Sequence, residues 1–310
     1  MNRFIRLRLL AMILCLSFLL IFISGCGSSS QKKDEPPVYS PLQVLVPEAT
    51  GKETLGSSPM ILDVSNISQG YFIAQSDSSD LTCSLQIISP SGVLYSYFIA
   101  PGESATVTFT EGSGDYTITG YQQVQGDQYA ALYSETVTVQ LENDFLPFLY
   151  PNQYVNFSPD SEASKLALSM VSEDTTDVDA LKQIYNYVVN NLTYDYDKAE
   201  TVETGYLPDV DETLSTKTGI CFDYAALTTA MLRSCDIPCK LQIGYTGDIK
   251  HAWIDVYIRS KGWVTGAVSF NGDSWSLMDP TFDSSADSDD TEAIQDYIGN
   301  ADNYTVQFTR

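Results

Sequence analysis

Residues 219–238 read GICFDYAALTTAMLRSCDIP. The run over residues 222–233 is apolar on most faces, which is typical of a helix buried in the centre of a domain. Cys221 directly precedes this run, so we expect it at the amino end of the helix. Unpaired backbone N–H groups and the positive end of the helix dipole stabilise a thiolate at that position. The sequence therefore predicts a reactive cysteine on a buried helix.

Two predicted strands follow this helix, over residues 240–245 and 251–258. The second strand reads HAWIDVYI and alternates cleanly between two faces. One face carries Ala252, Ile254, Val256 and Ile258, and the other carries His251, Trp253, Asp255 and Tyr257. His251 is the only histidine in the chain. Because no other unperturbed side chain titrates near neutral pH, it is the candidate general base.

A third predicted strand, residues 275–278, ends at Asp279, just before a proline. A carboxylate there is able to accept a hydrogen bond from one imidazole nitrogen and to turn the other toward the sulfur. The backbone N–H of Cys221 is a natural oxyanion donor, and no second donor is identified. Trp253 is a candidate wall of the substrate site, with an ordinary core position as the alternative.

Five short motifs share their order with a known family: GICFDYA (219–225), CDIPCK (235–240), HAWIDVY (251–257), GWV (262–264) and DPTF (279–282). Over about residues 160–310 the chain resembles the transglutaminase-like superfamily. The resemblance implies an α+β, papain-like catalytic domain, in which a cysteine helix packs on an antiparallel sheet. It also implies that Cys221 is the nucleophile, His251 the base and Asp279 the orienter. One departure is an added hairpin around residues 271–272, which bears on substrate contacts more than on the triad.

The amino terminus has the pattern of an export signal, with three arginines ahead of an apolar run over residues 9–23. This run is shorter than the roughly 20 apolar residues that a membrane-spanning helix needs. It ends in ISGC (23–26) and a polar stretch, which resembles a bacterial lipobox. The resemblance implies a signal peptide over residues 1–25, a lipid on Cys26 and an extracytoplasmic protein anchored to the bacterial cell membrane. An uncleaved signal anchor is the alternative.

Composition limits the partners. The chain has 40 acidic and 16 basic residues and a net charge of −24, which excludes nucleic acid. No pattern calls for a metal or an organic cofactor: Cys235 and Cys239, with a single histidine, make a poor zinc motif. We expect these two cysteines to be buried thiols, although a bridge between them is the alternative. The oligomeric state is left open.

The length and the 44% hydrophobic content allow about two domains. Residues 26–58 have the composition of a flexible tether. Residues 59–145 contain short β-branched and aromatic runs separated by turn signals, which predicts an all-β immunoglobulin-like sandwich with a spacer or presentation role. Tyr116 fits a tyrosine corner of that fold.

Residues 156–310 form the predicted catalytic domain, which opens with helices and closes with strands. One helix is expected after Ser158, as its N-cap, and another over residues 177–191. The loop over residues 195–219 is acidic. It is either a rim that favours amine-bearing peptides or a solvated surface of an acidic protein.

Taken together, these features predict a cell-surface thiol enzyme that acts on amide bonds of peptides, proteins or cell-wall peptides. A thiolate attacks the carbonyl, an amine leaves, and the acyl group passes to water or to another amine. Protease or amidase action, a hydrolase activity, is the first interpretation. A cross-linking transglutaminase and a non-catalytic surface binding module are the alternatives.

Overall fold

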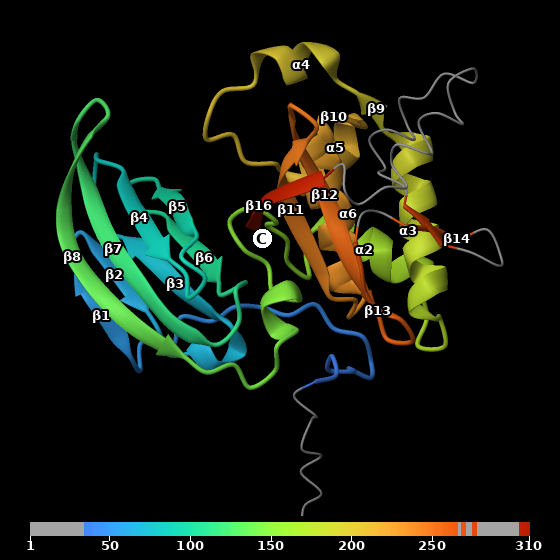
Figure 1. Ribbon diagram of the computed structural model, residues 1–310, viewed down its shortest axis with the longest axis horizontal. Helices are drawn as coiled ribbons and strands as arrows, with labels where there is room; N and C mark the ends of the chain where they lie inside the picture. The colour runs from blue at the N-terminus through green and yellow to red at the C-terminus, as the bar shows by residue number, and fades with distance from the viewer. Residues whose placement is uncertain (1–33, 266–267, 271–274, 278–303) are drawn as a thin grey trace, which may run out of the picture. The chain divides into compact units, whose positions relative to one another are not determined.

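The computed structural model describes residues 34–265, 268–270, 275–277 and 304–310, and all structural statements below concern these residues (Figure 1). Cys26, Asp279 and the signal peptide predicted over residues 1–25 lie outside them. Within the described part, no helix combines the length and the apolar composition that crossing a membrane requires.

The first half of the chain forms two four-stranded antiparallel sheets. One sheet has the order β1-β2-β3-β6, with β1 Thr54–Ser57, β2 Met60–Asp63, β3 Tyr71–Ser76 and β6 Ser104–Thr108. The other has the order β5-β4-β7-β8, with β4 Cys83–Ile88, β5 Leu94–Ile99, β7 Gly114–Gln125 and β8 Gln128–Val139. Leu62 and Phe72 of the first sheet share one buried core with Leu85 and Ile118 of the second. Strands β2 to β8 all lie within residues 59–145, the range that the sequence predicted to be all-β.

Tyr116 lies near the start of β7. Its hydroxyl donates a hydrogen bond of 2.8 Å to the carbonyl oxygen of Gly112, four residues upstream. This confirms the predicted tyrosine corner, in which the phenol ties a strand to the turn before it. Burial, above all, raises the pKa of Tyr116, so the hydroxyl keeps the proton that it donates.

The second half combines helices with a four-stranded antiparallel sheet of order β13-β12-β11-β16. The strands are β11 Cys239–Thr246, β12 Ile249–Ile258, β13 Gly262–Val264 and β16 Tyr304–Thr309. The helices are α2 Glu162–Met170, α3 Asp177–Asn191, α4 Tyr196–Thr201, α5 Val210–Thr216 and α6 Cys221–Ser234. Short pieces complete the order: η1 Ile67–Gln69, η2 Leu146–Phe148, the parallel pair β9 Thr193–Tyr194 and β10 Thr218–Gly219, and the hairpin β14 Val268–Phe270 and β15 Trp275–Leu277.

Helix α6 packs against the sheet (Figure 1). Ala226 and Ala230 of α6 share one core with Ile254 and Val256 of β12. Twelve residues of α6 are buried, which confirms the helix expected in the centre of the domain. Helix α3 also has the predicted bounds, and the Thr176 side chain caps it by accepting from the backbone N–H of Asp179.

Helix α2 begins later than expected. Ser158 was the predicted N-cap, but the N-cap is Ser161. The two serines make a tight turn instead: Ser158 N–H donates to the hydroxyl of Ser161, and Asp160 N–H donates to the hydroxyl of Ser158. A local side-chain turn therefore replaces the first helical turn.

Residues 34–57, within the stretch expected to be a tether, run along the folded body. Val44 belongs to the core around α6, and Leu45 packs with Leu149 and Tyr150. Tyr39 N–H donates to the Asp236 carboxylate at 3.1 Å, and Arg259 donates to the carbonyl of Pro37 at 3.3 Å. An extended segment held by single apolar anchors and backbone hydrogen bonds has no periodic pattern, which is why its composition suggested a tether.

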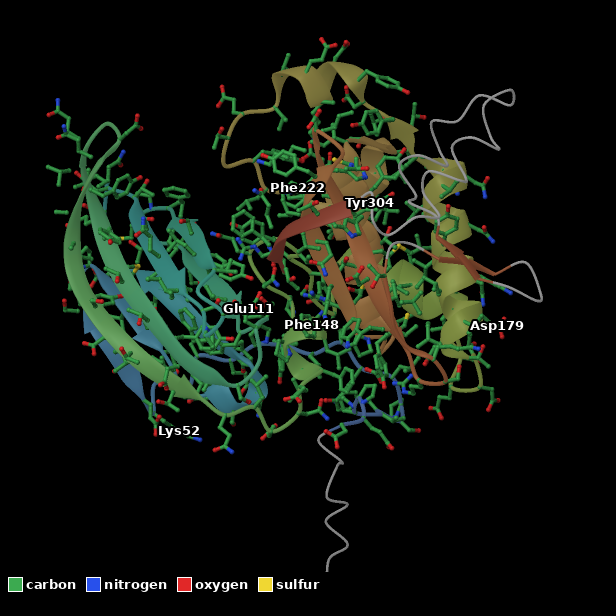
Figure 2. The ribbon with its side chains drawn as sticks, viewed as in Figure 1. Lys52, Glu111, Phe148, Asp179, Phe222 and Tyr304 are labelled. Atoms are coloured by element: carbon green, nitrogen blue, oxygen red, sulfur yellow. The ribbon has the colours of Figure 1, made fainter. Side chains whose placement is uncertain are left out.

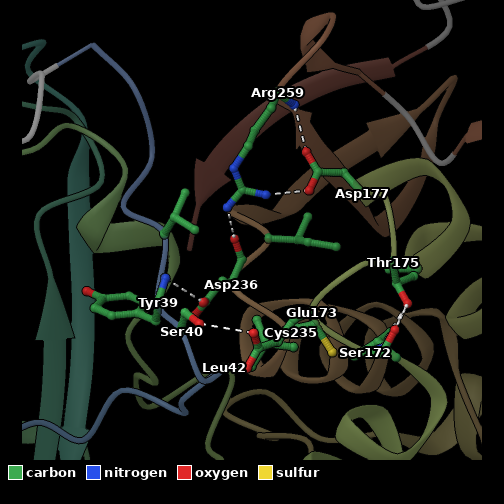
Figure 3. Close-up of a pocket in the computed structure, with 14 residues that line it drawn as sticks. Tyr39, Ser40, Leu42, Ser172, Glu173, Thr175, Asp177, Cys235, Asp236 and Arg259 are labelled. Atoms are coloured by element: carbon green, nitrogen blue, oxygen red, sulfur yellow. Dashed lines mark hydrogen bonds and ion pairs between the residues drawn. The ribbon is translucent and has the colours of Figure 1, made fainter.

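Asp236 lies at the edge of a cavity of about 170 Å³ beneath this segment (Figure 3). The carboxylate is 3% exposed, and burial raises the pKa of Asp236 to about 7. Arg259 bonds to the backbone carbonyl of Asp236 and to the carboxylate of Asp177. Burial therefore disfavours the charged form of the acid that receives the amino-terminal segment.

Replacing Asp236 by Asn is expected to stabilise the protein above neutral pH. The folded state of the wild type holds this proton more tightly than the unfolded chain does. Its free energy of unfolding is therefore highest below the ordinary carboxyl pKa, falls as the pH rises through about 7, and levels off above it. D236N removes this fall, and because the pKa rises from 3.8 to about 7, the gain at pH 8 is on the order of 4 kcal/mol.

Denaturant unfolding at pH 5 and pH 8 measures the difference. Asn suits the backbone of this position, where φ is +58°. D80N, at an exposed carboxylate, is the control and should follow the wild-type profile. A D236N profile parallel to wild type would contradict the assignment.

Candidate active site

Cys221 is the first residue of α6 and is partly exposed. Ile220 is the N-cap, and the first helical bond joins Tyr224 N–H to the carbonyl of Ile220 at 3.1 Å. The N–H groups of the first helical turn have no carbonyl partner within the helix. The expected position of the sulfur, at the positive end of a buried helix, is confirmed.

His251 lies in β12 and is 6% exposed. Its ring stacks on Trp253, with centroids 6.2 Å apart, and lies 6.4 Å from the ring of Tyr304. Trp253 and Tyr304 also contact each other, at 5.1 Å. The imidazole is thus supported by two aromatic rings, which limits the orientations it can adopt.

Trp253 is buried against the imidazole of His251. It is 1% exposed, so in this structure it supports His251 and does not line an open surface. Tyr304, labelled in Figure 2, was not identified from the sequence. It comes from β16, which pairs with β11 far along the chain, and no local pattern links it to the histidine.

Gly244 lies directly opposite His251 in the β11–β12 register. A Cβ atom at this position would lie 1.9 Å from the carbonyl oxygen of Thr305 and 3.0 Å from the Trp253 ring. The register of β11 with β16 also shifts between Ile243 and Gly244. Glycine therefore permits β16 to approach closely enough to bring Tyr304 to the histidine.

The third predicted triad member, Asp279, lies outside the described residues. The hairpin that precedes it is partly described: Val268 pairs with Leu277 and Phe270 with Trp275. This pairing agrees with the expected antiparallel hairpin, whose turn, predicted at residues 271–272, lies outside the described residues. It forms a separate two-stranded sheet and does not extend the four-stranded one.

A polar cluster beside Cys221 was missed by the sequence analysis. Asp223, fully buried in the first turn of α6, accepts hydrogen bonds from Lys198 at 2.8 Å and from the Tyr206 hydroxyl at 2.5 Å. Phe222, labelled in Figure 2, has the rings of Tyr154 and Tyr206 at 6.3 Å. The motif GICFD contained the acid, but its partners lie in the preceding loop, and their approach depends on the tertiary fold.

Three acids of the 195–219 loop act as helix caps. Asp195 accepts from Lys198 N–H at the start of α4, and Asp209 accepts from Asp211 and Glu212 N–H at the start of α5. Asp211 accepts from the first two N–H groups of α2, those of Glu162 and Ala163. Negative charge at these ends is stabilised by the helix dipoles, so part of the acidity of the loop is structural.

Cys83, Cys221, Cys235 and Cys239 are all free thiols. Cys235 and Cys239 are not bridged, which confirms the expectation of buried core thiols. Burial raises the pKa of each of these two to about 12, so both stay protonated at neutral pH. Across the described ranges, no group of three or more His, Cys, Asp and Glu side chains is arranged to hold a metal ion.

The described residues also form a groove of about 560 Å³, which neither Cys221 nor His251 lines. It is bounded by β6, by residues 151–158 and by residues 207–209. Gln153 and Leu207 line it, and their chain neighbours Tyr154 and Tyr206 both contact Phe222. Tyr154, Tyr206 and Phe222 do not themselves line the groove.

Comparison with known families agrees with this architecture. Residues 164–266, about a third of the chain, match the family model of the transglutaminase-like superfamily. The match includes Cys221 and His251 and ends before Asp279. This part of the chain is thus transglutaminase-like, with mixed α and β elements, as the motifs predicted.

Two curated relatives are similar over limited stretches. The UPF0252 protein MJ1282 of Methanocaldococcus jannaschii is 40% identical over 62 residues, which is 18% of each chain. The uncharacterized protein YebA of Bacillus subtilis is 26% identical over 175 residues, which is 49% of this chain and 23% of that protein. The chain spans less than a quarter of the length of either relative.

Solved structures show more distant likeness. A protein of Cytophaga hutchinsonii, provisionally described as a cysteine protease, has a TM-score of 0.36 and 16% identity over 83% of this chain and 84% of its own. The periplasmic domain of TgpA from Pseudomonas aeruginosa has a TM-score of 0.35 and 14% identity over 78% of this chain and all of its own. Neither likeness is close enough to define an activity.

Gly244→Ala is expected to separate β16 from the histidine. Because the added Cβ meets a backbone carbonyl, we expect a loss of about 2–3 kcal/mol of stability. Alkylation of Cys221 should also slow, since His251 loses the contact with Tyr304. Thermal unfolding and iodoacetamide labelling measure the two effects.

Gly126→Ala is the matched control. A Cβ at this turn glycine meets no atom within 4 Å, although φ is +53°. Its cost is limited to backbone strain of about 1 kcal/mol, and labelling of Cys221 should be unchanged. Equal effects of the two substitutions would contradict the close approach at Gly244.

Proposed function

We propose that this protein is a thiol enzyme that transfers acyl groups from peptide or protein amides, with hydrolysis as its main outcome. The observation that carries the proposal is the position of Cys221: it begins a buried helix that packs on β12, the strand of the only histidine. The family match over both residues supports an enzyme of this class.

In this proposal Cys221 attacks the amide carbonyl as a thiolate, and His251 receives the thiol proton. The tetrahedral oxyanion is stabilised by the N–H of Cys221, which the start of α6 leaves without a helical partner. His251 then returns the proton to the leaving amine, and a thioester remains. Water, activated by the same imidazole, releases the acid and restores the thiol. Asp279 would hold the histidine in the required tautomer.

The polar lining of the groove suits a polypeptide substrate. Its volume, about 560 Å³, is within the range of ligand-binding clefts. Its lining is rich in hydroxyl and amide groups, including Ser104, Thr106, Gln153 and Asn156. Such groups suit an extended peptide backbone of a protein or a cell-wall peptide. We propose no nucleic acid partner and no cofactor.

Alanine at Cys221 is expected to lower kcat/KM for peptide hydrolysis by at least about 1,000-fold, because the covalent step is lost. H251A should cause a loss of the same order, and D279N a smaller one. Cleavage of a fluorogenic peptide library, with mass spectrometry of the thioester, measures this. C235A, at a buried free thiol, is the control and should retain activity.

An added primary amine separates the possible outcomes. Release of free acid at an unchanged rate supports the hydrolase, whereas incorporation of the amine would identify a cross-linking transglutaminase. Full activity of C221A would contradict the proposal. A wild-type Cys221 no more reactive with iodoacetamide than a model thiol, without turnover of any peptide, would favour the binding module.

We further propose that the protein is held at the outer face of the bacterial cell membrane by a lipid on Cys26. The β domain then serves as an immunoglobulin-like spacer. Its strand order and the tyrosine corner at Tyr116 support this type of sandwich. The excess of acidic residues would keep the catalytic part away from anionic headgroups.

Cys26→Ala is expected to release the protein from the membrane fraction, because the acyl chains provide the anchor. Metabolic labelling with an alkyne fatty acid should mark the wild type and not C26A. C83A, at a buried cysteine of the β domain, is the control and should be labelled like the wild type. Labelled C26A would rule out this cysteine as the lipid site.

A further inference from the structure

Asp223 is a buried carboxylate two positions after Cys221. Its side chain is 0% exposed, and its oxygens accept three hydrogen bonds. Oδ2 accepts from Lys198 Nζ and from Ile220 N–H, both at 2.8 Å, and Oδ1 accepts from the Tyr206 hydroxyl at 2.5 Å. A buried charge is tolerated only when such partners are in place, so this cluster forms as a unit.

Lys198 and Tyr206 both keep the protons that they donate to Asp223 at neutral pH. Burial, and next the bond to Asp223, raise the pKa of Tyr206 to about 12, so its hydroxyl remains a donor. Burial alone would lower the pKa of Lys198, but the bonds to Asp223 and Tyr206 outweigh it and the net change is upward. Lys198 therefore stays cationic, and the carboxylate keeps its counter-ion across the neutral range.

Asp223 also acts on the backbone that leads into Cys221. It binds the N–H of Ile220, the residue before the cysteine. Gly219 gives it room: a Cβ at Gly219 would lie 2.6 Å from the Cβ of Asp223. The carboxylate thus accepts from the N–H of Ile220, just outside the helix. The N–H groups of the first helical turn remain available to an oxyanion.

The segment that leads to Lys198 is also hydrogen-bonded to the backbone just before Cys221. Thr193 N–H donates to the carbonyl of Lys217, and Asp195 N–H donates to the carbonyl of Gly219, both at 2.9 Å. The loop that follows, which contains Lys198 and Tyr206, is thus held both before and after Cys221. Such a two-point attachment restrains the backbone on which the sulfur sits.

We propose that Asp223 is a positioning residue for the nucleophile, and that Lys198 and Tyr206 act through it. The cluster holds residues 219–221 in the conformation in which the sulfur and the free N–H groups face the same carbonyl. This inference rests on the proposed function, since it describes how that reaction is supported. A positioning role should affect kcat far more than KM.

Two mild substitutions test the role. Y206F removes one donor and K198M removes the counter-ion, and each is expected to lower kcat at least ten-fold while KM changes less than three-fold. Because both act on one carboxylate, the double variant should lose less than the product of the two single losses. D223N should lose more than either single variant.

The controls break similar contacts elsewhere. K165M removes an exposed ion pair with Glu162, and Y150F removes a tyrosine hydrogen bond to Gln69. Neither should alter kcat. Hydrogen exchange of the peptide over residues 218–224 should speed up in K198M and Y206F and stay unchanged in the controls.

The outcomes separate this inference from the proposed function. Exchange and the pH profile of Cys221 alkylation report on the cluster even if no peptide is turned over. Unchanged exchange and alkylation in K198M and Y206F would overturn the positioning role, whatever the activity. A rise in KM at constant kcat would also overturn it, because the loop would then act only on substrate binding. If D223N fails to fold, the two milder variants decide.

Discussion

The arrangement of this protein depends on one buried cation. The Arg233 side chain, 1% exposed, donates to the carbonyl oxygens of Cys239, Tyr150 and Arg310. These carbonyls belong to the start of β11, the link between the two halves and the residue after β16. Burial lowers the pKa of Arg233 to about 10, so it is still charged at neutral pH. Desolvating this charge is compensated only when all three segments are in place, which makes their assembly cooperative.

Arg233 also determines where the candidate nucleophile lies. It sits in the last turn of α6, and Cys221 begins the same helix. Between them nearly every side chain is buried, so the helix has little freedom to slide or rotate. Asp223 restrains the opposite end through Ile220, Lys198 and Tyr206. A helix held at both ends gives Cys221 a defined position relative to β12, as the proposed covalent step would require.

The sequence was sufficient wherever a local period or cap carried the information. The buried helix after Cys221, the helix over residues 177–191, the alternating strand of His251 and the tyrosine corner all follow from such patterns. The missed features are contacts between distant segments. Tyr304 reaches His251 only because Gly244 admits β16, and Lys198 reaches Asp223 only because β9 pairs with β10. Neither approach has a signature within a single stretch of sequence.

Because the chain is acidic, its few Lys and Arg side chains each stabilise several contacts of the fold. Only 16 of the 310 residues are Lys or Arg, and several of them bond to more than one segment. The Arg310 guanidinium lies 4.1 Å from the Tyr154 ring and 4.5 Å from the Tyr95 ring, and it donates to the Tyr97 hydroxyl. Arg259 joins α3, the turn after α6 and the amino-terminal segment. In a chain with few cations, a neighbouring Lys or Arg is rarely available as a substitute. Removing one of these side chains therefore leaves several carbonyls, rings or carboxylates without their partner at once, whereas removing one of the many surface acids leaves a solvated position that water can fill.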